Sequence, residues 1–441
     1  MTVGELIEHL VSLGGAVALA GSEGNPRADA VPLDWDVLTV WGMPGAGKTA
    51  FLLGLGHRLV ETDPGREAVA YVDLGDARLA DAGAALPALV VDAFYRLHPA
   101  ARAARCTFLL DGIDAVSDWQ DAVRRLLDVY DARFAVALRG CARAEAEAFG
   151  KGRRVRTVGL GPLSFAEYAA LRPAGRRSSG SRDGGLLESY CAEGGLPGAL
   201  RRPPLERIAY LQGLVRGAVA DGPCGRAGAA RFAVGEAFAA YALGRASHPL
   251  SITRAAAELA RAGHTASRPA LALLLEGLAE AGIVHALGDC GHEHPGEGRL
   301  PRTVYAGDMG LMAAFAPGGA PSRADALRNA ALLELMRRGL GASVRSLRVA
   351  PGKSVDFAVV PEGTPAGESA VEEVVHFVDE DAAPHALRRA VGLLGGALMR
   401  VGLSEAVLLT VHTAGFWVVG SGAVRAVPIE QWLLEGPAGG R

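Results

Sequence analysis

Short apolar runs recur along the first third of the 441-residue chain. The clearest are Val37–Trp41, Ala68–Val72, Thr107–Leu110 and Phe134–Leu138. Apolar residues with helical spacing follow the first run, and another such stretch spans Ala115–Tyr130. Strands that are buried on both faces have continuous apolar sequences, and strands that alternate with helices form parallel sheets. The pattern therefore predicts an α/β domain built on a parallel sheet.

The pattern changes in the middle of the chain. Helical spacing begins at Pro203–Val219 and continues in Ser251–Ala262 and Arg268–Ala281. Two strand-like runs follow, Ile283–Leu287 and Arg302–Ala306, with a long turn between them. The order helix, helix, strand, turn, strand predicts a winged helix in an otherwise all-α module.

The recognition helix of that module would be Arg268–Ala281. It has a single basic residue, Arg268, and two glutamates. A helix that reads bases needs Arg, Asn, Gln or Lys on its exposed face. We therefore favour an architectural winged helix over a DNA-binding one. The residues that would support DNA binding electrostatically are Arg254, Arg261, Arg299 and Arg302.

The sequence GMPGAGKT, Gly42–Thr49, lies between the first apolar run and the helix after it. It matches the P-loop pattern G-x-x-x-x-G-K-[ST] in its proper strand–loop–helix context. Glycines allow backbone N–H groups to close around a phosphate, Lys48 would reach the β and γ phosphates, and Thr49 would ligate Mg²⁺. We predict a site for ATP and Mg²⁺ formed by Gly42, Met43, Pro44, Gly45, Ala46, Gly47, Lys48, Thr49 and Ala50.

A carboxylate is expected at the end of a neighbouring strand, where it would hold the metal beside Thr49. Asp111 ends the run TFLLD and takes this role. Many ATPases have a glutamate next, but here the residue is Gly112. Asp114 is the nearest carboxylate that could activate the attacking water, although it could equally be the N-cap of Ala115–Tyr130. Nucleotide binding is thus better supported than hydrolysis.

Composition and charge limit the binding partners and the cellular location that we expect. The net charge is −3, which argues against an overall electrostatic affinity for nucleic acid or anionic membranes. No apolar run reaches the ~18 residues that would span a bilayer, and the start MTVGELIEHL lacks the basic flank of a signal peptide. We expect a cytoplasmic protein without a membrane partner. The five cysteines are scattered singly, as in proteins with reduced thiols.

Two further segments resemble a known family. Val158–Leu171 is similar to the "PLSF.E(Y/F)" signature of the archaeal-type ATPases of the AAA+ superfamily, and Ser164 with Glu167 has capping-box spacing. Glu188–Leu200 resembles the "Y…GG.P" segment of the same family. The resemblance implies a polar residue that senses the γ-phosphate at Arg139, but we favour a solvated arginine at the end of a strand.

The same resemblance implies an arginine finger. The family's Gly-Arg pair is matched by Gly152 and Arg153. In such ATPases this arginine often acts on the nucleotide of a neighbouring subunit, so the resemblance also implies a homo-oligomer. The alternative is a solvated surface arginine, because Arg153 lies in a basic stretch.

The C-terminal third resembles the domain that accompanies these ATPases. The matching segments are Tyr305–Phe315, Leu327–Gly339, Ser354–Val360 and the sequence AVEEVVHF. The resemblance implies a restriction-endonuclease-like α/β domain, in which carboxylates at Glu334, Asp356 and Glu373 would hold a metal.

One position departs from the nuclease pattern. Val375 stands where the family has the lysine that orients or deprotonates water, and only Lys353 could replace it. We therefore expect a docking or binding domain rather than a working nuclease.

The sequence thus predicts three domains: a P-loop ATPase (1–200), a helical and winged-helix module (201–310) and an inactive restriction-endonuclease-like domain (311–441). The preferred function is an AAA+-like ATPase that acts as a nucleotide-dependent switch or remodeller on a nucleic-acid or protein partner. The alternative is a regulator that binds but does not hydrolyse nucleotide and recognises DNA through its C-terminal half.

Overall fold

The computed structural model contains an N-terminal unit, Met1–Gly161, and a C-terminal unit, Pro162–Arg441. Within them it describes residues 3–20, 25–62, 68–141, 143–149, 153–172, 185–221, 228–290, 302–339, 342–361, 364, 367–383 and 385–435. Each unit is described by itself below.

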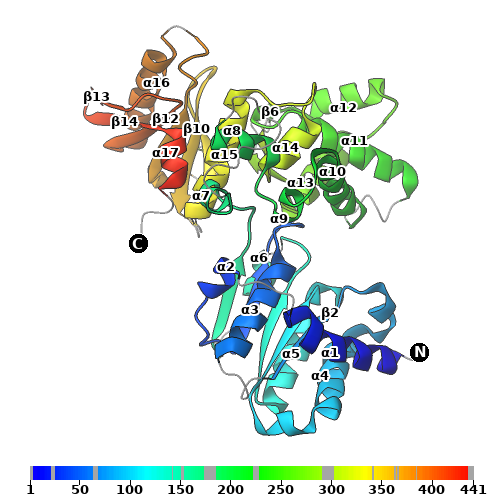
Figure 1. The fold of residues 1–441 in the computed structure, drawn as a ribbon. Helices are drawn as coiled ribbons and strands as arrows, with labels where there is room; N and C mark the ends of the chain where they lie inside the picture. Colours follow the sequence, from blue (N-terminus) through cyan, green and yellow to red (C-terminus); the bar gives the residue numbers. More distant parts are fainter. Residues whose placement is uncertain are drawn as a thin grey trace. The chain divides into compact units, whose positions relative to one another are not determined.

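The N-terminal unit is built on a five-stranded sheet, coloured blue to cyan-green in Figure 1. All its pairings are parallel, and the strand order is β2–β3–β4–β1–β5. The strands are β1 Val37–Trp41, β2 Ala68–Asp73, β3 Cys106–Asp111, β4 Ala132–Ala137 and β5 Val155–Gly159. The α-helices are α1 Val3–Ala20, α2 Pro26–Asp29, α3 Lys48–Thr62, α4 Leu86–Leu97, α5 Trp119–Val129 and α6 Arg143–Glu147. The sheet confirms the predicted α/β architecture and fits a P-loop NTPase core.

The centre of this sheet is buried and largely apolar, as the sequence predicts, with Thr107, Asp111 and Arg133 as the buried polar residues of β3 and β4. Every residue of β3 and β4 is buried, and the rings of Phe108 and Phe134 stack with centroids 5.3 Å apart across the two strands. Helices α1, α4 and α5 contribute Leu6, Val90 and Trp119 to the same core. Burial of such side chains stabilises the fold by roughly 1.5–3 kcal/mol each.

One helix boundary differs from the sequence prediction. Helix α5 begins at Trp119 rather than at Ala115, because Ile113–Ala115 forms a separate 3₁₀ turn. Asp118 then adopts a left-handed conformation with φ of 54°. This conformation interrupts the right-handed helical path, so the two segments cannot form one helix.

The C-terminal unit contains two sheets. A six-stranded mixed sheet has the order β13–β14–β12–β11–β10–β9, and a three-stranded antiparallel sheet has the order β6–β8–β7. The larger comprises β9 Ala342–Ala350, β10 Lys353–Pro361, β11 Glu373–Phe377, β12 Glu405–Thr410, β13 Gly415–Val419 and β14 Gly422–Pro428. The smaller comprises β6 His248–Leu250, β7 Val284–Leu287 and β8 Arg302–Ala306.

Eleven α-helices complete the described part of this unit. They are α7 Phe165–Ala170, α8 Leu186–Glu193, α9 Pro197–Leu200, α10 Pro204–Asp221, α11 Ala229–Leu243, α12 Ile252–Arg261, α13 Arg268–Glu280, α14 Met309–Phe315, α15 Arg323–Arg338, α16 Ala386–Val401 and α17 Ile429–Leu434. Figure 1 shows α10 to α13 gathered on one side of the unit and α16 beside the six-stranded sheet. Among the described residues, the helices are too short or too polar to cross a bilayer.

The division between the units differs from the predicted boundary at residue 200. It falls between Gly161 and Pro162. The following segment is fastened inside the C-terminal unit, because the backbone N–H of Gly195 donates to Asp308 Oδ2 at 2.7 Å and the N–H of Leu163 donates to the carbonyl of Gly195 at 2.8 Å. The capping box itself is present, with Ser164 and Glu167 each accepting the other's backbone N–H.

Candidate nucleotide-binding site

The loop between β1 and α3 has the backbone conformation that its glycines allow. Gly42, Gly45 and Gly47 have φ values of 151°, 83° and 94°, a region that residues with a Cβ rarely adopt. At Gly42 the constraint is also steric, since a Cβ would lie 2.0 Å from the carbonyl oxygen of Leu160. The loop opens directly into α3, whose N-terminus favours an anion.

The ammonium of Lys48 lies inside this loop. Its Nζ donates to the carbonyl oxygens of Gly42, Met43 and Arg139 at 2.7, 3.2 and 3.1 Å. Burial lowers the pKa of Lys48 below its ordinary value. Neutral carbonyls stabilise a buried cation less than an anion would. A phosphate group bound here would therefore meet an ammonium group that is already positioned and that pairs with no carboxylate among the described residues.

Thr49 of α3 and Asp111 of β3 meet although β1, the strand before the loop, is not a neighbour of β3. The Thr49 hydroxyl donates to Asp111 Oδ2 at 2.5 Å, and β4 lies between β1 and β3. Tyr71 donates a second hydrogen bond to the same oxygen at 3.2 Å. Burial raises the pKa of Asp111, and a cation would offset that desolvation. A hydroxyl and a carboxylate are oxygen ligands of the kind Mg²⁺ prefers, so the donor set fits this ion.

Asp114 lies at the same edge but does not cap a helix. Its Oδ1 accepts the backbone N–H of Arg139 at 2.9 Å, and the Arg139 Nε lies 3.4 Å from the same atom. The capping alternative is therefore wrong, since α5 begins only after Asp118. The Gly112 position, with φ of 66°, forms the turn between Asp111 and Asp114.

Arg139 contacts the loop in two ways. Its carbonyl accepts from Lys48, and its half-exposed side chain pairs with Asp114. It is thus neither remote from the site nor simply solvated. Arg139 lies beside the loop because it follows β4, and β4 is the strand between β1 and β3.

Arg153 is the one predicted residue that the fold places elsewhere. It precedes β5, whose Val155 pairs in register with Val37 at the start of β1, whereas the P-loop follows the end of β1. At ~3.3 Å per residue, this five-residue strand separates its two ends by roughly 15 Å. The Arg153 guanidinium instead pairs with Asp128 at 2.5 Å. Its predicted partner in the Gly-Arg pair, Gly152, lies outside the described residues.

Sequence reasoning did not identify Tyr71 as a site residue. A signal was available, because Tyr71 and Asp73 are alternate residues of β2 and alternate residues share one face of a strand. Asp73 is in register with Asp111. The contact between Tyr71 and Asp111 nevertheless depends on β2 lying next to β3, which the apolar runs alone do not specify.

The comparison with protein families agrees with this geometry. Residues 34–169 match the family described as an AAA domain. The comparison with curated proteins gives no match.

Among solved structures, the chain is similar to a Walker-type ATPase of Pyrococcus abyssi, with 14% identity and a TM-score of 0.41 over 64% of this chain and 91% of the other. It is also similar to the Aeropyrum pernix ORC1 protein in complex with DNA, with 14% identity and a TM-score of 0.30 over 71% and 91% of the two chains. At such TM-scores these likenesses carry no weight for function. The family match and the loop geometry together support an AAA-type P-loop ATPase domain in the N-terminal unit.

Proposed function

We propose that the N-terminal unit binds ATP with Mg²⁺ and hydrolyses it, and that the nucleotide state changes what the C-terminal unit binds. The observation that carries the proposal is the convergence of Lys48, Thr49 and Asp111 at one glycine loop. These three groups supply the cation, hydroxyl and carboxylate that a nucleoside triphosphate and its metal require.

Each residue has a separate part in this proposal. Lys48 binds the β and γ phosphates, and the N–H groups of the Gly42–Gly47 loop surround them. Thr49 and Asp111 hold Mg²⁺, which when bound neutralises phosphate charge. Asp114 orients or deprotonates the attacking water, and Arg139 keeps that carboxylate in place through its backbone and guanidinium N–H groups.

Titration of Lys48→Ala with a fluorescent ATP analogue tests the central claim. We expect affinity to fall by roughly a hundredfold, since charge-assisted hydrogen bonds are lost. Lys353→Ala is the matched control, because Lys353 is an exposed lysine of the other unit. If Lys48→Ala binds the analogue as tightly as the unaltered protein does, the proposal that ATP binds at this loop is wrong.

The second candidate is a regulator that binds nucleotide without hydrolysing it. Gly112 favours this candidate, because it follows Asp111 where many ATPases have a catalytic glutamate. The two candidates differ in phosphate release from the purified protein, measured with and without DNA. Release that is absent in both conditions, despite tight ATP binding, would support the regulator.

We infer that the C-terminal unit carries the partner-binding function. Its α12, α13, β7 and β8 follow the order that the sequence predicts for a winged helix. The exposed side of α13 includes Leu273, which is 53% exposed. The same side also exposes Glu276 and Glu280, and Arg268 is its one exposed basic residue. This composition supports contact with protein rather than base readout.

We also infer that the six-stranded sheet does not cut nucleic acid. Asp356 is engaged by Arg328 Nε at 3.1 Å, by His376 Nδ1 at 2.7 Å and by the backbone N–H of Phe377 at 2.9 Å. Although burial acts to raise its pKa, these partners hold the pKa of Asp356 below its ordinary value.

The carboxylate of Glu334 is likewise paired with cationic side chains. It is 1% exposed, and it pairs with Arg337 and with Arg338, whose Nε lies 2.8 Å away. A carboxylate whose charge is already balanced by internal cations has little affinity for a metal. Val375 is buried in β11, so it offers no group to activate water.

Incubation with linear, circular and single-stranded DNA and with RNA, in Mg²⁺ or Mn²⁺, tests the absence of nuclease activity. We expect no cleavage by the protein or by Asp356→Ala. Cleavage that disappears in Asp356→Ala would contradict the inference and would direct attention to Lys353.

A further inference from the structure

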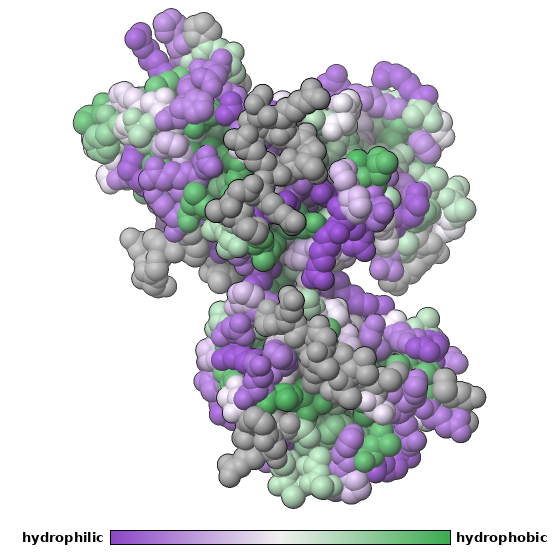
Figure 2. All heavy atoms as spheres, in the orientation of Figure 1, coloured by the Kyte–Doolittle hydropathy of each residue, from purple (hydrophilic) through white to green (hydrophobic). Residues whose placement is uncertain are grey.

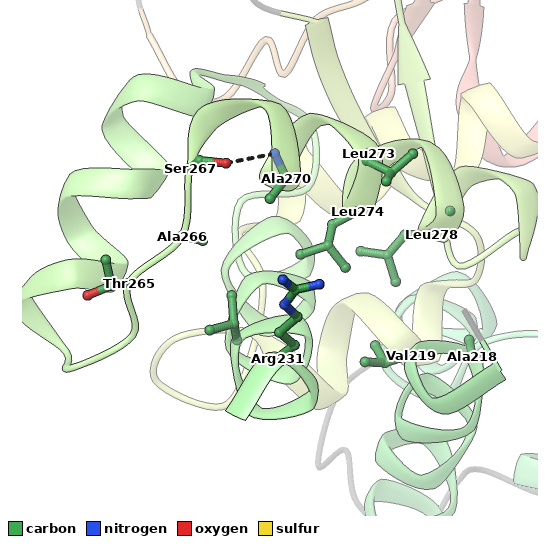
Figure 3. Close-up of a pocket in the computed structure, with 12 residues that line it drawn as sticks. Ala218, Val219, Arg231, Thr265, Ala266, Ser267, Ala270, Leu273, Leu274 and Leu278 are labelled. Carbon is green, nitrogen blue, oxygen red and sulfur yellow. Dashed lines mark hydrogen bonds between the residues drawn. The ribbon is translucent and has the colours of Figure 1, made fainter. Parts of the chain in front are cut away.

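A cavity of about 340 Å³ lies among the helices α10, α11 and α13 of the C-terminal unit. Figure 3 shows it between the side chains of Leu274, Leu278 and Val219, with the Arg231 guanidinium directed among them. This volume is at the lower end of the ~300–1,000 Å³ range of small-molecule sites. The cavity is distinct from the nucleotide site, which belongs to the other unit.

The walls are apolar and the polar groups are few. Leucine, valine and alanine side chains form most of the lining, and Arg231, Thr265 and Ser267 are its polar residues. None of the lining residues that the structure describes is acidic. An apolar lining of this kind can bind the apolar part of a ligand, and a few polar groups gathered at one place can orient the polar group of that ligand.

Among the described residues of the lining, Arg231 is the only charged one, and its side chain is exposed. No ion pair of Arg231 is found among the described residues, whereas the nearby Arg216 and Arg245 pair with Glu236 and Glu258. Arg231 also lies in the first turn of α11, where the helix dipole is positive and a cation is unfavourable. An anion bound beside this guanidinium would pair with its charge and interact favourably with the dipole of α11.

A second helix N-terminus opens on the same cavity. Ser267 caps the 13-residue helix α13 by accepting the N–H of Ala270 at 3.3 Å, the bond drawn in Figure 3. Helix α10 contributes only the apolar Ala218 and Val219. The positive ends of α11 and α13 and the guanidinium therefore coincide at one apolar cavity.

We propose that this cavity binds a small monocarboxylate with an apolar tail, the carboxylate pairing with Arg231 and the tail lying against Leu274, Leu278 and Val219. One guanidinium matches one carboxylate in a bidentate pair, whereas a doubly charged phosphate monoester needs further cations that the lining does not supply. Because Ser267 and Ala270 belong to the start of α13, the ligand binds beside the helix predicted to recognise a partner.

Octanoate and its neutral analogue 1-octanol are the probes, and titration calorimetry is the measurement. We expect octanoate to bind the unaltered protein at least tenfold more tightly than 1-octanol, because only the carboxylate pairs with Arg231. Arg231→Ala should weaken octanoate by roughly tenfold or more and leave 1-octanol unchanged.

Two further variants keep the test decisive. Ala270→Trp places a large ring in the cavity from an exposed helix position, so it should block both probes. Arg261→Ala, which removes an exposed arginine of α12 outside the cavity, should bind like the unaltered protein. Thermal unfolding confirms that each variant is folded. Absence of octanoate binding at millimolar concentration, or equal binding by all four proteins, would overturn the proposal.

Discussion

At the scale of single residues, the nucleotide site combines groups that are each held by short hydrogen bonds before any ligand is considered. Lys48 is held by three carbonyl groups and Asp111 by two hydroxyls. Side chains held in this manner lose little conformational freedom on binding. Asp114 is held by the backbone N–H of Arg139, a bond that positions the carboxylate whether it serves catalysis or the fold.

Asp114→Asn separates these roles, because asparagine can still accept the Arg139 N–H but cannot take a proton. We expect turnover to fall by ~10²-fold or more with ATP affinity unchanged, as for a group that acts in the transition state. Phosphate release at saturating ATP is the measurement. Asp118→Asn is the control, since Asp118 is exposed and asparagine tolerates its left-handed backbone. Normal turnover of Asp114→Asn would make Asp114 a structural residue.

Asp308 predicts a pH dependence of stability in the C-terminal unit. Burial raises its pKa to about 6, from an ordinary value of 3.8, despite hydrogen bonds from Gly195, Gly310 and Leu311. The folded state therefore keeps a proton that the unfolded state releases near pH 4. This contribution to stability is fully present below about pH 4 and is lost as the pH rises through 6.

Asp308→Asn cannot titrate and isolates this effect. We expect the free energy of unfolding of the unaltered protein, relative to the variant, to fall by roughly 2 kcal/mol between pH 4 and 6.5. Urea unfolding at a series of pH values measures it. A difference that stays constant with pH would show that folding does not raise the pKa of Asp308.

At the scale of elements, the P-loop depends on close backbone approach. Gly42 donates its N–H to the carbonyl of Gly140 at 3.4 Å, and a Cβ on Gly42 would overlap the Leu160 carbonyl. The loop therefore connects the strand ends of β1, β4 and β5, and its conformation follows from all three.

Gly42→Ala should distort this loop and abolish binding of the fluorescent ATP analogue, with a destabilisation of about 1–3 kcal/mol. Gly140→Ala is the matched control, because a Cβ there meets no atom within 4 Å. Analogue affinity and the unfolding temperature are measured for both. If both variants bind like the unaltered protein, the loop does not require its observed conformation.

At the scale of the whole molecule, Arg153 can act on a nucleotide only from a second copy. It lies at the edge of the sheet opposite the P-loop, and its exposed pair with Asp128 is worth only ~0–1 kcal/mol, so it can change partners easily. The action of Arg153 on the nucleotide of a neighbouring subunit is a prediction that rests on the sequence resemblance to AAA+ ATPases.

Mixing Lys48→Ala with Arg153→Ala tests it. Each variant alone should be inactive, whereas mixed assemblies contain an intact loop facing an intact arginine and should recover part of the phosphate release. Co-assembly is verified by sedimentation. Demonstrated co-assembly without recovery, or full activity of Arg153→Ala alone, would count against the finger.

The sequence by itself determined the local features of this protein. The four apolar runs in the first third of the chain predicted β1, β2, β3 and β4, because a strand buried on both faces requires continuous apolar residues. The glycine pattern predicted the loop, since few residues other than glycine adopt its backbone angles. The Ser164 capping box was likewise readable, because its bonds join residues three apart.

Only the tertiary structure decided which distant groups meet. The order β2–β3–β4–β1–β5 brings Tyr71 to Asp111 and Arg139 to Lys48, and it removes Arg153 from the site. Strand order depends on how helices pack between strands, which no single apolar run encodes. The charge balance around Asp356, and the meeting of Arg231 with the start of α13, likewise arise from packing between elements far apart in the sequence.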